Sequence, residues 1–274
     1  MSLSLDRNYK IISVGLQEHY EDALKAGYDP LVIALQGSQN YDLAYDNSDI
    51  DTKCLVMPSL KDIVFNHRPV SFTKIRENEE HIDIKDIRVY FEQFWKQNIN
   101  FLEILFTPYV LLDNKFAPYW KELTSYKEDI ARFNEVGAVK AMYGMAFEKY
   151  KALKYPYPTI KWKNDKWGYD GKQLHHILRI EEFIRAYIEG ENFSKCLVSY
   201  PKYGKEFLLA VKKNEFSLEM AEKIANESMN IIQHMKDEFI STYSVYINNG
   251  IKTKVNDILY EIFKHYTKKE LEEL

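Results

Sequence analysis

The sequence predicts an α+β protein, with a small sheet-containing part followed by an all-helical part. Short apolar runs bounded by turn residues are typical of buried strands, and they cluster before residue 90. They cover residues 31–35, 49–57, 70–75 and 79–86. Beyond residue 115 such runs become scarce, and Gly, Pro and Asn separate segments of helical length at 115–128, 134–153, 171–189, 204–214, 217–247 and 251–272. We therefore expect two domains, residues 1–110 and 111–274.

The first elements follow from residue spacing. Residues 8–27 are predicted to form a helix that ends at Gly27, after which Asp29-Pro30 turns the chain into the first strand. Residues 59–66 are compatible with either a helical turn or an edge strand, and 87–95 with an amphipathic helix whose aromatic stripe belongs to the core. The expected apolar positions of the first helix are Ile11, Ile12, Leu16, Tyr20 and Leu24.

Net charge, cysteine content and the length of apolar runs limit the classes of function that this chain can have. The 274 residues carry a net charge of −4, so a nucleic-acid contact would need a local basic patch. The two cysteines lie far apart in sequence, and Cys54 falls within an apolar strand, which favours a buried thiol over a disulfide framework or zinc site. No apolar run reaches about 18 residues and no signal peptide is evident, so we expect a cytoplasmic protein without a membrane partner. The oligomeric state is not predicted.

The stretch from Leu31 to Pro58 carries most of the functional information. An apolar run leads into Gly37-Ser38, and Asp49, Ile50 and Asp51 precede the next apolar run. On a strand, Asp49 and Asp51 would share one face while Ile50 enters the core. Two carboxylates about 4 Å apart repel by roughly 4 kcal/mol at an effective dielectric near 20, so a cation is expected to compensate them. Hard ions such as Mg²⁺ prefer oxygen ligands, Gly37 allows close approach of a phosphate, and Ser38 is an expected helix N-cap.

This order of elements resembles the DNA polymerase β nucleotidyltransferase superfamily, and more closely its bacterial and phage branch, some members of which are associated with RNA repair. The resemblance is carried by G-S-x-x-Y-x-L followed by S-D-I-D, namely Gly37, Ser38, Tyr41, Leu43, Ser48, Asp49, Ile50 and Asp51. It implies a small mixed-sheet catalytic domain, followed by a helical domain that closes over it.

The resemblance also implies a third metal carboxylate on a later strand. Asp83 in EEHIDIKD is the candidate, with Glu80 and Asp86 as alternatives because the strand register is inferred. The following stretch DIRVYFEQFWKQNINFLEILF resembles the helix pair of the same branch. Asp49, Asp51 and Asp83 would then hold two Mg²⁺ ions, with Mn²⁺ as an alternative, and Asp83 would be the general base.

A cationic stripe is predicted on the helix at 171–189. Lys172, His176 and Arg179 lie at i, i+4 and i+7 and therefore share one helix face. Such a stripe suits triphosphate oxygens, and it resembles the helical-domain motif of the same branch; an exposed basic face is the alternative interpretation. His175 points away from this face and is expected to be structural.

The segment 154–172 interleaves basic residues with aromatic rings. Rings and lysines together can stack on and steer single-stranded nucleic acid, although the rings could equally cover the helical domain. The aromatic residues are Tyr155, Tyr157, Trp162, Trp167 and Tyr169.

Together, these features predict a nucleotidyltransferase that uses an NTP, with Gly37 and Ser38 at the phosphates and an RNA or DNA end as acceptor. Two alternatives stay open: nucleotidylation of a protein or of a small molecule such as an aminoglycoside, and a non-catalytic nucleotide-binding or antitoxin-like protein. An intact acidic triad argues against the last alternative.

Overall fold

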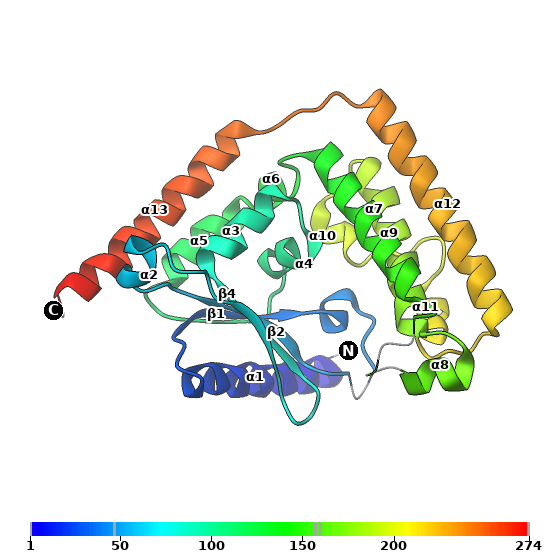
Figure 1. Ribbon diagram of the computed structural model, residues 1–274, viewed down its shortest axis with the longest axis horizontal. Helices are drawn as coiled ribbons and strands as arrows, with labels where there is room; N and C mark the ends of the chain where they lie inside the picture. Colours follow the sequence, from blue (N-terminus) through cyan, green and yellow to red (C-terminus); the bar gives the residue numbers. More distant parts are fainter. Residues whose placement is uncertain (1, 46–47, 156–157, 159–160, 273–274) are drawn as a thin grey trace. The chain divides into compact units, whose positions relative to one another are not determined.

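The computed structural model describes residues 2–45, 48–155, 158 and 161–272. It is an α+β structure with one mixed sheet and many helices, as the sequence predicts (Figure 1). The chain divides into two compact units, one formed by Met1–Phe133 with Ile247–Leu274 and the other by Asn134–Tyr246. Residues 111–133 and the last helix thus belong to the unit that contains the sheet, whereas the sequence expectation grouped them with the helical domain.

The sheet has five strands among the described residues. They are β1 (Pro30–Gln36), β2 (Asp51–Val56), β3 (Ser71–Ile75), β4 (His81–Asp86) and β5 (Val110–Leu112). Their order is β3-β4-β2-β1-β5; β2 and β4 run parallel, and the other neighbours are antiparallel. The four predicted strands are confirmed, and the three-residue β5 is an addition too short for a periodic pattern.

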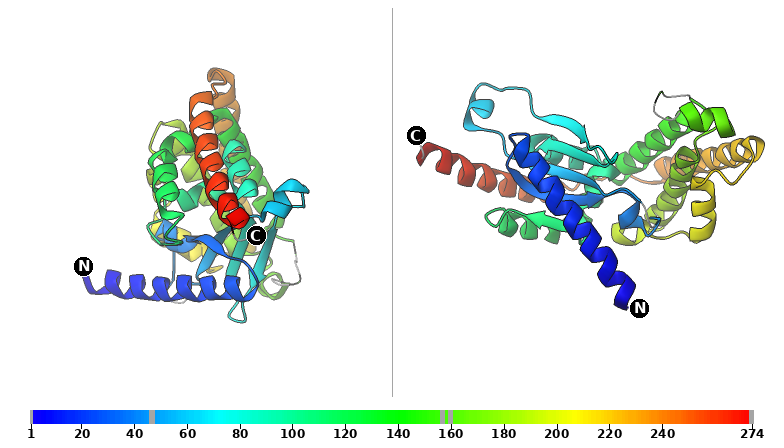
Figure 2. Two further views of the ribbon diagram at one scale, coloured as in Figure 1. Left: turned by 90° about the vertical axis from the view of Figure 1, so that its left-hand side faces the viewer. Right: turned by 90° about the horizontal axis from the view of Figure 1, so that it is seen from below.

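Helices cover both faces of the sheet. The helices of this unit are α1 (Ser2–Lys25), η1 (Ser38–Tyr41), α2 (Leu60–Val64), α3 (Ile87–Trp95), α4 (Ile99–Leu102), η2 (Glu103–Leu105), α5 (Ala117–Ser125), α6 (Lys127–Ala131) and α13 (Asn249–Glu272). Helix α1 lies across one face, and α3 and α4 lie on the other (Figures 1 and 2). Residues 60–64 are helical because Ser59 and Asp62 form a reciprocal capping box, which settles the alternative left open by the sequence.

The core between α1 and the sheet is built by alternation along the strands. Its buried members from α1 are Ile12, Leu16 and Ala23, and those from the strands are Ile33, Leu35, Cys54, Val56, Ile82 and Ile84. The expected apolar face of α1 was wrong at two positions, since Ile11 is 50% and Leu24 is 45% exposed. The buried stripe instead follows Ile12, Leu16, His19 and Ala23, which keeps the helical spacing but includes a histidine.

The second unit is all-helical in its described residues and is organised around one helix. Its elements are α7 (Glu135–Ala152), α8 (Lys161–Trp167), α9 (Gly171–Ile188), α10 (Phe193–Cys196), α11 (Lys205–Lys212) and α12 (Leu218–Thr242). Helix α9 packs against α7, α10, α11 and α12 and is mostly buried. Helix α12 ends at Thr242 rather than 247, because the following run of aromatic and β-branched residues disfavours a helix.

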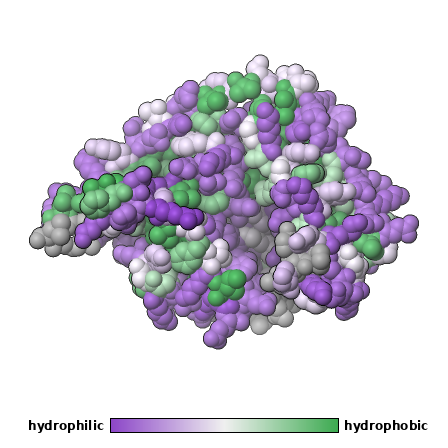
Figure 3. Space-filling model, viewed as in Figure 1, coloured by the Kyte–Doolittle hydropathy of each residue, from purple (hydrophilic) through white to green (hydrophobic). Residues whose placement is uncertain are grey.

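The molecular surface fits these assignments. The face shown in Figure 3 is mostly hydrophilic, with scattered apolar side chains. Within the residues described, no helix combines the length and apolar character that a membrane span requires.

Candidate functional site

The turn at Gly37 lies beside Asp51. Strand β1 ends at Gln36, which pairs with Asp51, and Gly37 then adopts φ 86° and ψ −153°, a conformation almost restricted to glycine. A Cβ added at Gly37 would lie 3.9 Å from Asp51 Oδ2. The structure therefore brings these two predicted residues together at one end of the sheet.

The element after the turn differs from the prediction in one respect. The N-cap of the short 3-10 helix is Gly37 and not Ser38, and no side-chain hydrogen bond caps this helix. Ser38 is its first residue, and its carbonyl accepts from Leu43 N at 3.2 Å. Its predicted role as an N-cap was thus wrong, because the chain already turns at the glycine.

The Asp49-Ile50-Asp51 segment only partly follows the prediction. Ile50 is buried, as expected, but strand β2 begins at Asp51, so the exposed Asp49 precedes the strand rather than lying on it. The pairing of β2 with β1 ends at Asp51, because β1 turns away at Gly37. A Cβ on Gly15 of α1 would lie 2.6 Å from Ile50 Cδ1, so the missing side chain at Gly15 lets Ile50 seat against the helix.

Asp51 faces the β4 strand and retains some solvent exposure. Its side chain is 28% exposed, and Oδ1 accepts a hydrogen bond from His81 N at 3.0 Å. The His81 Nδ1 atom lies 3.7 Å from the same oxygen. Asp51 is thus held at the start of β2 while its side chain remains partly exposed.

Asp83, the candidate third acid, is held by two lysines. Its Oδ2 accepts from Lys53 Nζ at 2.6 Å, and its Oδ1 lies 2.7 Å from Lys85 Nζ and 3.2 Å from the Thr73 hydroxyl. Burial acts to raise the pKa of Asp83, but the two lysines outweigh it and the pKa is lowered. Burial lowers the pKa of Lys53, and Asp83 opposes that shift.

The two alternative acids have other structural partners. Asp86 is 1% exposed, caps helix α3 by accepting from Arg88 N, and accepts from the Arg88 guanidinium with both oxygens. Glu80 accepts from the Ile50 backbone N–H at 3.3 Å. Each carboxylate therefore holds a backbone N–H group near a strand end: Asp86 holds that of Arg88 after β4, and Glu80 holds that of Ile50 before β2.

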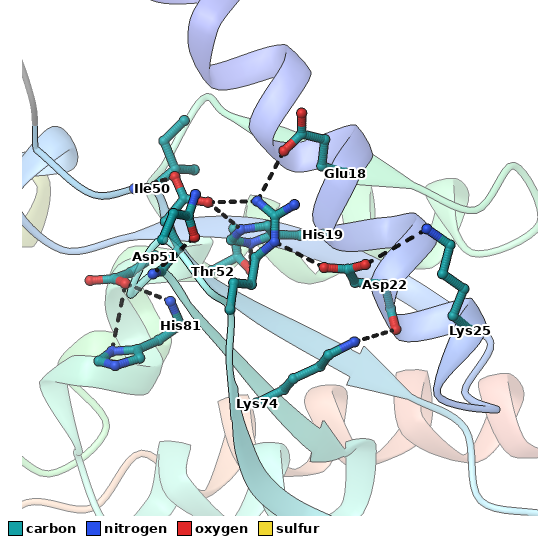
Figure 4. Close-up of polar contacts among 12 residues, drawn as sticks. Glu18, His19, Asp22, Lys25, Ile50, Asp51, Thr52, Lys74 and His81 are labelled. Carbon is teal, nitrogen blue, oxygen red and sulfur yellow. Dashed lines mark hydrogen bonds and ion pairs between the residues drawn. The ribbon is translucent and has the colours of Figure 1, made fainter.

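Glu80 belongs to a polar network between α1 and the sheet, whose members His19 and Thr52 are labelled in Figure 4. Its Oε2 accepts from Arg76 at 2.7 Å and from His19 Nε2 at 3.1 Å, while His19 Nδ1 lies 2.7 Å from the Thr52 hydroxyl. Because a carboxylate only accepts, His19 carries its proton on Nε2 and receives one hydrogen bond from Thr52. Burial lowers the pKa of His19 despite the neighbouring Glu80.

This network positions the candidate site, because Thr52 follows Asp51 and Glu80 holds Ile50. Arg76 extends it to α1 by hydrogen bonds to Glu18 and Asp22, each at 2.9 Å. None of these roles was predicted. The one available signal was a histidine at a core-facing position of α1.

The three predicted acids fit a two-ion magnesium site only in part. Asp49 and Asp51 offer carboxylate oxygens of the kind that hard cations prefer, and both are at least partly exposed. The charge of Asp83, in contrast, is already balanced by Lys53 and Lys85. In the part of the chain that the structure describes, no group of three or more His, Cys, Asp or Glu side chains is arranged to hold a metal ion. The two-ion arrangement through Asp83 therefore does not fit, and a single cation at Asp49 and Asp51 stays a prediction.

The predicted cationic stripe lies on α9 of the helical unit. Lys172 is exposed, and His176 and Arg179 are half-buried. Lys149 of α7 belongs to the same cluster: burial lowers its pKa, and the charge of Lys172 lowers it further. Sequence spacing could not identify Lys149, because it comes from a different helix.

His176 of this stripe and the neighbouring His175 are both neutral at pH 7. Burial, reinforced by nearby cations, lowers the pKa of His176 well below its usual range. His175 is 2% exposed and donates from Nδ1 to the Leu208 carbonyl at 2.9 Å, which confirms its structural role. His176 can therefore donate one hydrogen bond to an anion but adds no charge at this pH.

The aromatic segment at 154–172 contains both exposed and buried rings. Tyr155 and Trp162 are 57% and 58% exposed, whereas Tyr169 is fully buried and donates to the Phe216 carbonyl at 2.9 Å. Trp162 and Trp167 contact one another on α8, with ring centroids 5.7 Å apart. Tyr157 lies outside the described residues. The covering role is thus observed for Tyr169, and nucleic-acid stacking stays a prediction for the exposed rings.

Comparison with solved structures finds distant similarities, among them the following one. The chain is similar to a crystal structure of a nucleotidyltransferase-like protein from Exiguobacterium sibiricum 255-15, with 12% sequence identity and a TM-score of 0.30. The similarity covers 90% of this chain and 77% of that chain. No protein-family model matches the chain, and no curated protein matches it either.

Proposed function

We propose that this chain is a nucleotidyltransferase that transfers an NMP from an NTP to an acceptor and releases pyrophosphate. The observation that carries the proposal is the Gly37 turn beside Asp51, at the sheet end where the sequence motif predicted a nucleotide site. A glycine backbone in this conformation presents no side chain to an approaching phosphate. The partly exposed Asp51 side chain lies next to that turn.

Each residue then has a distinct task. The Gly37-Ser38 turn approaches the phosphates, and Asp49 and Asp51 would hold a divalent cation, Mg²⁺ or Mn²⁺. When bound, this cation supplies charge stabilisation at the phosphate oxygens. His81 and the Glu80 network fix the orientation of the Asp49–Asp51 segment.

The cationic cluster of the helical unit is proposed to bind phosphate oxygens. Arg179 would act as a bidentate donor, Lys172 and Lys149 as point charges, and His176 as a neutral donor. The clustering of several cations within one unit supports this role, because an anion relieves their mutual repulsion. Arg179→Ala is expected to weaken triphosphate binding more than monophosphate binding, and equal effects would remove Arg179 from this role.

The acceptor is proposed to be an RNA or DNA end. The exposed rings of Tyr155 and Trp162 and the lysines of α8 supply groups that could contact single-stranded nucleic acid. A second candidate function is nucleotide binding without transfer. The pairing of Asp83 with Lys53 favours it, because a carboxylate held in this way is a poor general base.

One experiment separates these functions. The protein is incubated with each of the four α-labelled NTPs and Mg²⁺ or Mn²⁺, with RNA, DNA, a protein mixture or no acceptor. Label should enter nucleic acid, and Asp51→Asn should lower the rate by about two orders of magnitude or more. Asp29→Asn, which changes an exposed acid before the other end of β1, serves as the matched control with parent activity.

The outcomes are distinct. Equal transfer by the parent and Asp51→Asn would refute the proposed site, and label in protein alone would change the acceptor class. Nucleotide binding without any transfer would favour the second candidate.

A further inference from the structure

Lys53 is a charged side chain buried in the middle of the sheet. It is 2% exposed, and its ammonium group lies 4.1 Å from the centroid of the Phe101 ring, on the face opposite α1. A buried ammonium group needs a counter-charge, because its transfer from water is otherwise strongly unfavourable. Asp83 is the carboxylate that supplies this charge, at 2.6 Å.

The backbone fixes this pair, since Lys53 and Asp83 are direct partners in the parallel ladder of β2 and β4. Their Cα atoms belong to neighbouring strands, which lie about 4.8 Å apart in a sheet. Asp51 precedes Lys53 by two residues, about 7 Å along the strand, and points to the same face. Lys53 therefore lies on the same face of the sheet as Asp51 and Asp83. It is the direct neighbour of Asp83, the residue that the sequence predicted as the third metal ligand.

Both oxygens of Asp83 are engaged. Lys53 takes Oδ2, while Lys85 and the Thr73 hydroxyl take Oδ1. A divalent cation that recruited Asp83 would have to displace an ammonium group, leave Lys53 buried without its counter-charge and add a second positive charge beside it. Removing one partner of a buried ion pair is strongly destabilising, so binding through Asp83 is disfavoured.

We propose that Lys53 is a built-in counter-cation of Asp83, so that a divalent cation at this site takes its carboxylate ligands from Asp49 and Asp51 and not from Asp83. This deepens the proposed function and rests on it for the presence of a metal.

The test measures Mn²⁺ binding to the full chain by calorimetry, without nucleotide. The parent should bind one ion, and Asp51→Asn should lower the affinity about tenfold or more. Asp83→Asn leaves a buried lysine unpaired and could unfold the unit. The double variant Lys53→Met with Asp83→Asn therefore accompanies it, since replacing both partners is far less costly. This double variant should keep the parent affinity within about twofold.

The single variant Lys53→Met is expected to gain Mn²⁺ binding. It frees Asp83 from its buried partner, so it should raise Mn²⁺ affinity about tenfold or add a second ion. Two ions in the parent, or a tenfold loss in the double variant, would overturn the inference and leave the proposed function intact. If the parent binds no Mn²⁺, the metal part of the proposed function fails. In that case the Lys53→Met variant provides the test. Mn²⁺ binding to this variant would support the inference, and the absence of Mn²⁺ binding would overturn it.

Discussion

His175 makes the stability of the helical unit depend on pH in a way that can be calculated. The ring is 2% exposed and joins α9 to α11 through its hydrogen bond to the Leu208 carbonyl. Burial, with a further contribution from the charge of Arg179, lowers its pKa to about 3. In the unfolded chain the same ring has a pKa of about 6.5.

The sign follows from proton uptake. Between the two pKa values the unfolded state binds a proton that the folded state does not, so stability falls as the pH falls below about 6.5. From pH 7 to pH 5 the loss due to His175 is about 2 kcal/mol, at 1.36 kcal/mol per pH unit below the unfolded pKa. This figure depends on the unfolded pKa alone, because pH 5 lies well above the folded value.

The assay is chemical denaturation of the parent and His175→Asn at both pH values. The asparagine amide can still donate to Leu208 but does not titrate, so the gap in unfolding free energy between the two proteins should narrow by about 2 kcal/mol at pH 5. The control is His234→Asn, which replaces an exposed histidine of α12. The difference in unfolding free energy between the parent and this variant should change by less than about 0.5 kcal/mol between pH 7 and pH 5. A gap between the parent and His175→Asn that is equal at pH 7 and pH 5 would refute the reasoning.

Three further predictions concern two glycines, one in each unit, and the thiols. Gly37→Ala should lower the unfolding free energy by about 1–3 kcal/mol, because the backbone conformation at residue 37 is strained for other residues. Gly144→Ala in α7, where an added Cβ meets nothing within 4 Å, should instead raise it by up to about 1 kcal/mol. Unchanged stability of Gly37→Ala in denaturation curves would contradict the first of these. Burial raises the pKa of Cys54 to about 12, and Cys196 is also buried, so a thiol reagent should label neither without denaturant. Rapid labelling of the native protein would show that at least one thiol is accessible.

Local pattern was sufficient for four of the strands, the helical remainder and the glycine turn after the first strand. Each of these depends on residues close in sequence: apolar runs ending in turn residues, helical spacing along 171–189, and a positive φ that selects glycine at 37. The boundaries were less accurate. Asp49 falls outside β2, because a strand ends where its partner turns away, and that partner is β1.

The partners of the charged groups were decided by tertiary structure. The sequence contains Lys53 and Asp83, but only the parallel register of β2 and β4 places them side by side and turns a presumed metal ligand into half of a buried ion pair. The same holds for His19 with Glu80 and for Lys149 beside α9. Periodicity tells which face of an element is apolar, whereas the charge that meets another charge is fixed by packing between elements distant in sequence.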